Sequence, residues 1–216
     1  MAHIHLEDGS FSLLWVAVWW TAAIILVGIA IYLIRSDKKP DRRTITLAAF
    51  CTAAAFAIFQ VSIPLFGGVH LNLTPLIGIL AGPAAGSLVV LIINILSAAI
   101  GHGGWGLIGA NTLVNIVEVF VGYACFRLLK FIIPDLFSRA GIVTIFGLLC
   151  GNIAMILIVV ISGVQGVNQS TGQILAGLSL LAAVNMGVTV IEAFITGLII
   201  AYIGTVRPDL LGMERS

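Results

Sequence analysis

Long apolar runs separated by short polar or glycine-rich breaks make up almost the whole chain. The first run, 13–34, is long enough to cross a membrane as a helix. Acidic Glu7 and Asp8 precede it instead of the basic flank of a signal peptide, so we expect this helix to be retained. The next stretch, 35–43, has five basic residues in nine. The positive-inside rule places that stretch in the cytoplasm and the amino terminus outside.

Six further apolar runs predict the remaining helices: 45–66, 73–81, 84–100, 107–129, 141–162 and 174–204. The run 73–81 is short, and Gly82-Pro83 ends it. If it did not cross, the basic residues near the end of 107–129 would lie outside, against the positive-inside rule. We therefore expect a short or tilted crossing helix. The sequence predicts an all-α membrane protein, a bundle of about seven helices with the amino terminus outside and the carboxyl terminus in the cytoplasm.

Composition supports a multi-pass protein of the plasma membrane. Of the 216 residues, 60% are hydrophobic and 9% are charged, against about 25% charged residues in soluble domains. We expect one transmembrane domain, 1–216, with an extracellular metal-binding segment (1–11), a helical bundle (12–206) and a cytoplasmic tail (207–216). The net charge of +1 gives no attraction to nucleic acid. No lysine follows a glycine, so the chain has no P-loop, and ATP would be hydrolysed by another subunit.

The predicted topology places all four histidines (His3, His5, His70 and His102) on the outer side. An amino terminus followed by an early histidine can chelate a metal through its amine, its backbone amides and the imidazole. Such nitrogen donors in a plane suit Ni(II) and Cu(II). If Met1 stays, Met1-Ala2-His3 supplies four nitrogens. If Met1 is removed, Ala2-His3 supplies three, which leaves a position for His5 or His70.

Several short motifs, spread over nearly the whole chain, are those of one family. They are His5-Leu-Glu-Asp8-Gly9, Gly68-Val-His70-Leu71, Gly101-His-Gly-Gly104 with Leu107-Ile-Gly-Ala-Asn111, and Glu192-Ala-Phe-Ile-Thr-Gly197 with Val206-Arg-Pro-Asp-Leu210. In this order they resemble the CbiM/NikM family, the substrate-binding membrane components of nickel and cobalt energy-coupling-factor transporters. The resemblance implies a seven-helix bundle into which the amino terminus inserts from outside.

The resemblance also implies the metal ligands and the partners. The ligands are the terminal amine, the next backbone nitrogen with its imidazole, and a second histidine, here His70. In the family the first histidine is residue two. Spacing to Asp8-Gly9 makes His5 its counterpart, whereas distance from a processed terminus makes it His3. We interpret Ala2, His3 and His70 as ligands, with His5 as a fourth or replacement donor.

Nickel or cobalt would be the transported substrate, with no bound organic cofactor. The implied partners are a transmembrane coupling protein and two ATPase subunits, with or without a small accessory membrane subunit. Around the metal we expect His102, in a glycine-rich loop, and Asn111 and Asn115, at the start of the following helix. A tight turn and simple helix–helix contacts are the alternatives for these three residues.

Glu118 and Glu192 are carboxylates inside predicted helices, where ionisable groups are costly. They suggest either a proton pathway or a hydrogen bond between helices. The first leads to an alternative function, a proton- or sodium-coupled secondary transporter. A vitamin-binding component of the same transporter class is a second alternative, and an intramembrane metalloenzyme a third. No HExxH motif is present, and we expect no enzyme activity.

Overall fold

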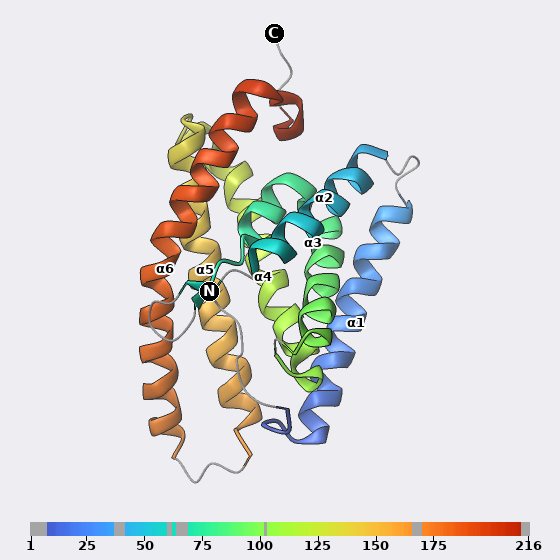
Figure 1. The fold of residues 1–216 in the computed structure, drawn as a ribbon, viewed down its shortest axis with the longest axis vertical. Coiled ribbons are helices and arrows are strands. Elements are labelled where there is room, and N and C mark those ends of the chain that lie inside the picture. Colours follow the sequence, from blue (N-terminus) through green and yellow to red (C-terminus); the bar gives the residue numbers. More distant parts are fainter. Residues whose placement is uncertain are drawn as a thin grey trace.

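Helices packed side by side form the protein in the computed structural model, which describes residues 8–36, 42–59, 62–63, 69–101, 103–165 and 170–212 (Figure 1). The elements are α1 (Leu13–Ser36), α2 (Arg42–Phe59), β1 (Ser62–Ile63), β2 (Val69–His70), α3 (Thr74–Ala99), η1 (Trp105–Leu107), α4 (Ile108–Leu128), η2 (Leu129–Phe131), α5 (Leu136–Ser162), α6 (Thr171–Val206) and η3 (Pro208–Leu211). Within these residues, five helical stretches are long and apolar enough to cross a membrane.

The helices predicted from the runs 13–34, 107–129, 141–162 and 174–204 are all present as α1, α4, α5 and α6. Local capping sets two of their starts. Asp135 caps α5 by accepting a hydrogen bond from the Ser138 N–H at 2.8 Å. Ser170 and Gln173 form a reciprocal capping box at the start of α6. Both helices therefore begin before the first residue of their apolar runs.

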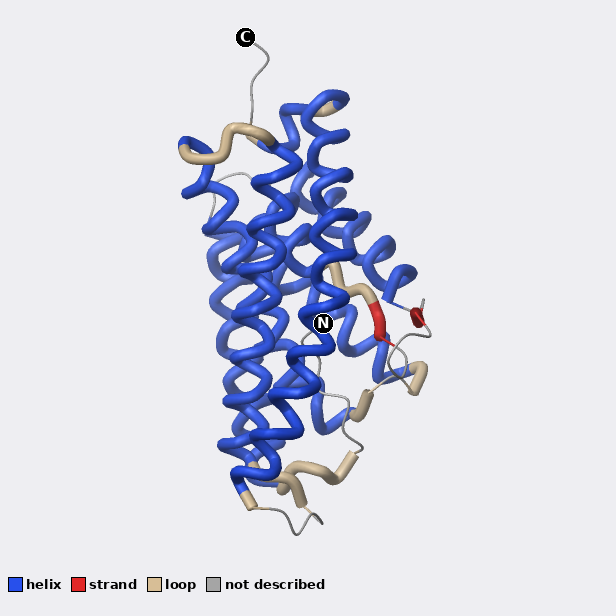
Figure 2. Tube along the Cα trace, turned by 90° about the vertical axis from the view of Figure 1, so that its left-hand side faces the viewer, coloured by secondary structure: helices blue, strands red, loops and turns tan. Residues whose placement is uncertain are grey.

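The prediction of a full crossing helix over 45–66 was wrong. Helix α2 has 18 residues and ends at Phe59, and it is not among the five helical stretches long enough to cross. Ser62 then pairs with His70 in the short antiparallel ladder of β1 and β2. This ladder lies at mid-height of the bundle and not at either end (Figure 2). The connection between α2 and α3 thus enters the interior.

Helix α3 bends sharply at Gly82, which has φ 76° and ψ 173°. A Cβ placed on Gly86 would lie 3.5 Å from the Ile77 side chain, whereas nine residues of straight helix span about 13 Å. The two arms of α3, 74–81 and 83–99, therefore fold against each other. The predicted crossing by 73–81 was wrong: this arm runs only from the middle of the bundle to one end (Figure 1).

The arms explain why the helix count was hard to predict. In the described residues, α2 and the first arm of α3 together enter and leave the bundle from one end, so the helices that follow keep their predicted directions. The ends of α1, α4 and α6 and the start of α5 lie together at this end of the bundle (Figure 1). Near these helix ends the chain carries basic residues (Arg35, Arg127, Lys130, Arg139 and Arg207). Within the predicted tail 207–216, η3 packs beside α6 at this end.

Candidate metal site

Two carboxylates, Glu118 of α4 and Glu192 of α6, lie completely buried in the centre of the bundle. The Leu73 N–H donates to Glu192 Oε1 at 2.6 Å, and the Asn72 N–H donates to Glu192 Oε2 at 3.3 Å. Both oxygens of Glu192 therefore hold the backbone immediately before α3 begins. Residues 119 or more apart in sequence meet at this point.

The backbone at Leu73 adopts an unusual conformation that makes this contact. Its φ is 51°, and among the described residues it is the only non-glycine with a positive φ. The left-handed conformation costs an L-amino acid about 1–2 kcal/mol. Such strain persists only where the surroundings determine it. Here the two hydrogen bonds to Glu192 provide that constraint.

Glu118 holds the same segment through side chains. The Asn72 amide nitrogen lies 3.2 Å from Glu118 Oε2 and 3.3 Å from Asn115 Oδ1. The Thr74 hydroxyl donates to the same Glu118 oxygen. Gly151 of α5 packs so closely that a Cβ there would overlap the Glu118 side chain. The other oxygen, Oε1, has no hydrogen-bond partner among the described residues. Glu118 thus makes a hydrogen bond between helices, to Thr74 of α3, whereas Glu192 bonds the backbone just before α3.

His70 lies just before this segment and is 6% exposed. We predicted it on an outer loop, and that placement was wrong. Because α2 ends early, the connection that carries His70 enters the bundle, where Glu118 and Glu192 fix residues 72–74. The imidazole is therefore in the interior, near the level of the middle of α4.

Asp8 anchors the amino-terminal segment at the far end of the bundle from the basic residues. Its carboxylate accepts hydrogen bonds from the Trp105 N–H at 3.1 Å and the Gly106 N–H at 2.9 Å. A Cβ on Gly104 would overlap the Asp8 side chain, so glycine is required there. Two motifs that were separate in the sequence, Asp8-Gly9 and the glycine-rich break 101–106, therefore form one contact.

The residues after Asp8 complete the anchor. The Gln165 N–H donates to the Ser10 carbonyl at 2.8 Å. Phe11 is 3% exposed and packs among buried residues of α4 and α5, including Val114 and Met155. Residues 8–11, which directly follow residues 1–7, are thus fixed between α1, α4 and α5.

The structure brings together only part of the predicted site. Asn111 and Asn115 are buried on α4, 2% and 1% exposed. The remaining predicted site residues, Ala2, His3, His5 and His102, lie outside the described residues. Within the described part of the chain, no three His, Cys, Asp or Glu side chains gather in a way that would hold a metal ion.

Sequence reasoning missed Asn72 and Thr74, which connect the His70 segment to Glu118. Their only signal is that polar side chains flank Leu73 where an apolar run begins. The role of Asp8 was also missed. Its signal was its position directly before a glycine, outside the first helix.

Comparison with known proteins identifies the family. The family model for CbiM, described as the cobalt uptake substrate-specific transmembrane region, matches residues 5–210. The chain belongs to the CbiM family. It is 28% identical over 214 residues to a chain of Archaeoglobus fulgidus whose name describes a fused nickel transport protein, covering 96% of this chain and 68% of that one.

Two further likenesses agree with this membership. The cobalt transport protein CbiM of Sorangium cellulosum is 32% identical over 132 residues, which is 59% of each chain. The crystal structure of a transition metal transporter has the same fold, with a TM-score of 0.79 at 20% identity, covering 94% of this chain and 93% of the other. The overall fold of this chain is thus shared with a solved structure.

Proposed function

We propose that this protein is the metal-capturing membrane component of a cobalt or nickel uptake system. Membership of the CbiM family supports the substrate class. The observation that carries the mechanism is the buried His70 segment, which Glu118 and Glu192 fix inside the bundle. An imidazole held in this way can receive an ion without reorganising, which favours tight binding.

The ion would enter from the end of the bundle at which Asp8 is anchored. The opposite end carries the basic residues of the helix termini, and the positive-inside rule makes that end cytoplasmic. The amino terminus would then approach His70 from outside, as the family resemblance implies. The anchored Asp8 supports this arrangement because it fixes the point from which the preceding residues extend.

Chain length favours His3 over His5 as the amino-terminal ligand. Asp8 bonds at the level of Gly106, and Asn115 lies nine residues further along the chain into α4, a distance of about 14 Å. The five residues from His3 to Asp8 can span about 17 Å when extended, whereas the three from His5 span about 10 Å. The His3 backbone can therefore reach the level of Asn115, which the His5 backbone cannot.

The proposed ligands are the His3 imidazole, its backbone nitrogen, the His70 imidazole and, where the mature chain begins at Ala2, the Ala2 amine. Four nitrogens in a plane suit nickel. His5 would replace a donor when the terminus is longer. Asn111 and Asn115 would hydrogen-bond the amino-terminal segment, and His102 would lie on the loop that covers it.

Movement of the ion across the membrane would need other subunits. The chain has no P-loop, so ATP hydrolysis would come from two ATPase subunits joined through a transmembrane coupling protein. In the described residues, the alanine-rich helix α2 buries Cys51 and Ala55 against α3, while Phe50 on another face is 71% exposed. This exposed face of α2 is where we would place the coupling protein.

A titration of purified protein with Ni(II) and Co(II) tests the proposal. Wild-type protein, released with its native amino terminus, should bind one ion. His70→Ala and His3→Ala should each remove binding, and His5→Ala should weaken it less than tenfold. Because a ligand imidazole must be neutral, affinity should fall as the pH drops below about 6.5, the usual pKa of histidine.

An added amino-terminal tag tests the amine separately, since it should weaken binding strongly while leaving the fold intact. Full binding by His70→Ala would refute the site. Full binding by tagged protein would refute the amine ligand and favour His5. Loss of uptake in Glu118→Gln and Glu192→Gln, with metal binding intact in purified protein, would instead favour the proton-coupled alternative.

A further inference from the structure

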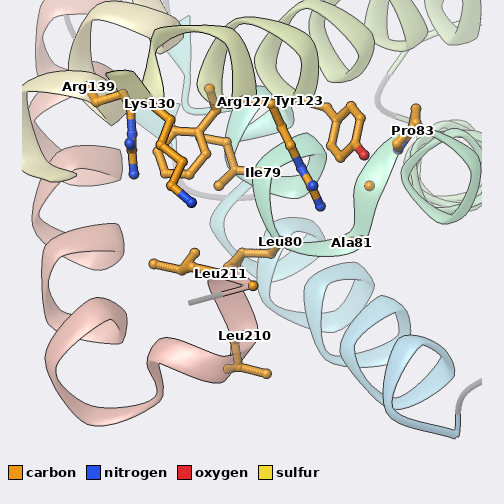
Figure 3. Close-up of a pocket in the computed structure, with 13 residues that line it drawn as sticks. Ile79, Leu80, Ala81, Pro83, Tyr123, Arg127, Lys130, Arg139, Leu210 and Leu211 are labelled. Atoms are coloured by element: carbon orange, nitrogen blue, oxygen red, sulfur yellow. The ribbon is translucent and has the colours of Figure 1, made fainter. Parts of the chain in front are cut away.

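A second polar region lies at the basic end of the bundle, in a cavity of about 490 Å³. The cavity lies where the bend of α3, the end of α4, the start of α5 and η3 meet (Figure 3). Three cationic side chains, Arg127, Lys130 and Arg139, line it together with Tyr123. Leu210 and Leu211 of η3 form part of its apolar lining.

Arg139 is the most deeply buried of these cations, with 4% exposure. Its guanidinium lies 4.3 Å from the centre of the Phe126 ring. Its Nε is buried and has no hydrogen-bond partner among the described residues. A buried charge without a partner is costly, and such groups are normally paired. Arg139 therefore lines the cavity while its buried Nε–H donates to no described residue.

The other two cations, Arg127 and Lys130, are exposed at the mouth of the cavity. Arg127 stacks over Tyr123 at 5.2 Å, and the one ion pair given by the described residues joins Arg207 to Asp209. Asp135, four residues before Arg139, attracts the guanidinium electrostatically, while its carboxylate accepts the hydrogen bond that caps α5. In Figure 3, Arg127, Lys130 and Arg139 extend into the same space. Three positive charges thus converge on a cavity that no Asp or Glu of the described chain lines.

The chemistry of this lining indicates the kind of ligand. Guanidinium groups match the oxygen geometry of phosphate through paired hydrogen bonds, and lysine adds a compact charge. Basic pockets between transmembrane helices on the cytoplasmic side are known to bind phospholipid headgroups. The apolar side of the cavity, with Leu210 and Leu211, suits the carbon chain next to such a group.

We propose that this cavity, which we call the inner basic pocket, binds a phosphate group at the cytoplasmic membrane surface. Arg127, Lys130 and Arg139 would contact the phosphate oxygens. The phosphate would be carried either by an anionic phospholipid or by a soluble phosphate compound. Because η3 lines the pocket, a bound phosphate would also fix the segment 208–212 against α3 and α4. The assignment to the cytoplasmic side rests on the proposed function, but binding itself does not.

Binding can be measured on full-length, delipidated protein in detergent with three probes. They are short-chain phosphatidylglycerol, short-chain phosphatidylcholine and inorganic phosphate, each followed by calorimetry. We expect phosphatidylglycerol to bind at least tenfold more tightly than phosphatidylcholine. Phosphate binding as tightly as phosphatidylglycerol would identify a soluble source, and the proposal would stand in that form.

Variants identify the pocket as the binding site. Arg127→Gln combined with Lys130→Gln should weaken binding at least tenfold, and Arg139→Gln should weaken it by a similar factor. Arg35→Gln is the matched control, since it removes one exposed positive charge at the same end but outside the pocket. Circular dichroism and thermal melting check that each variant is folded, and the double variant alone suffices if Arg139→Gln unfolds.

Four results would overturn the proposal. The first is no binding of any anionic probe. The second is an equal loss of affinity in Arg35→Gln and in the pocket variants. The third is equally tight binding of acetate, which would indicate a pocket for the carboxylate of a protein partner. The fourth is binding seen only with Glu214→Gln, which would show that the chain's own carboxylate occupies the pocket. None of these results depends on whether the protein binds nickel or cobalt.

Discussion

The centre of the bundle and the inner basic pocket each hold buried charged side chains, Glu118 and Glu192 in the centre and Arg139 in the pocket, yet they differ in how those groups are satisfied. In the centre, both oxygens of Glu192 and one oxygen of Glu118 accept hydrogen bonds from residues 72–74. In the pocket, the buried Nε of Arg139 donates to no residue of the described chain. The carboxylates in the centre thus position backbone, whereas the arginine in the pocket keeps a donor that a ligand could use.

Removing the acceptor in the centre should have the largest effect. Glu192→Ala leaves the N–H groups of Asn72 and Leu73 buried and unpaired, at a cost of about 3–5 kcal/mol. For a chain of this size, that lowers the melting temperature by roughly 6–20 °C. Thermal unfolding in detergent measures the shift, and Glu192→Gln, which keeps one acceptor oxygen, should lose less. A wild-type melting temperature for the alanine variant would show that the carboxylate does not hold this segment.

Crowding the same centre should have a smaller effect. In Gly151→Ala, the new Cβ overlaps the Glu118 side chain, and overpacking of this kind costs about 1–3 kcal/mol. Gly187→Ala on α6 is the control, because no atom lies within 4 Å of its added Cβ. We expect Gly151→Ala to melt at a lower temperature than Gly187→Ala. Equal melting temperatures would mean that Glu118 moves aside freely.

The two ends of the bundle can be compared through one aspartate each. Asp8 and Asp135 both accept backbone N–H groups, Asp8 at the amino-terminal anchor and Asp135 at the basic end. Asp8→Ala should weaken metal binding about tenfold, because the amino-terminal segment loses its fixed point. Asp135→Ala should lower the melting temperature without changing metal affinity. Titration of both variants with nickel measures the two affinities. Equal affinities would show that the Asp8 anchor does not contribute to metal binding.

The smallest effect is a pH dependence at the basic end. Hydrogen bonding from Ser138 lowers the pKa of Asp135 below its ordinary value. Because the folded pKa is the lower one, the stabilisation is fully present above the unfolded value of about 3.9 and is lost as the pH falls through the folded pKa. In Asp135→Asn, the melting temperature should therefore depend less on pH in this acidic range. If the pH dependence of the melting temperature is unchanged in this variant, other carboxylates must cause it.

The length and order of the apolar runs were enough to predict α1, α4, α5 and α6. The same runs misplaced the connection between α2 and α3. The apolar run continues past Phe59, and hydropathy does not tell how deep in the membrane a residue lies. A half-length helix and a crossing helix have the same composition, and only contacts with Glu192, more than a hundred residues away, distinguish them. Gly82-Pro83 correctly marked a break but gave no sign that the two arms fold together.

For the candidate site, the sequence was informative about residue type and uninformative about depth. His70, Asn111 and Asn115 were selected for their chemistry, and all three are buried. The inner basic pocket was not foreseen, although Arg127, Lys130 and Arg139 were used to orient the chain. The positive charges of these three residues were enough to predict the side of the membrane on which they lie. Their convergence on one cavity depends on how α4, α5 and η3 pack.

The bend at Gly82 has an electrical consequence for the membrane. Only the arm Thr74–Ala81 separates the His70 segment from the basic end, a layer of about 12 Å compared with about 30 Å for the whole hydrocarbon core. If water reaches His70 from the outer side, the insulating layer is thin at this point. The voltage across the membrane would then fall mainly over this arm, and a divalent ion at its outer edge would experience a steeper field than in the surrounding bilayer.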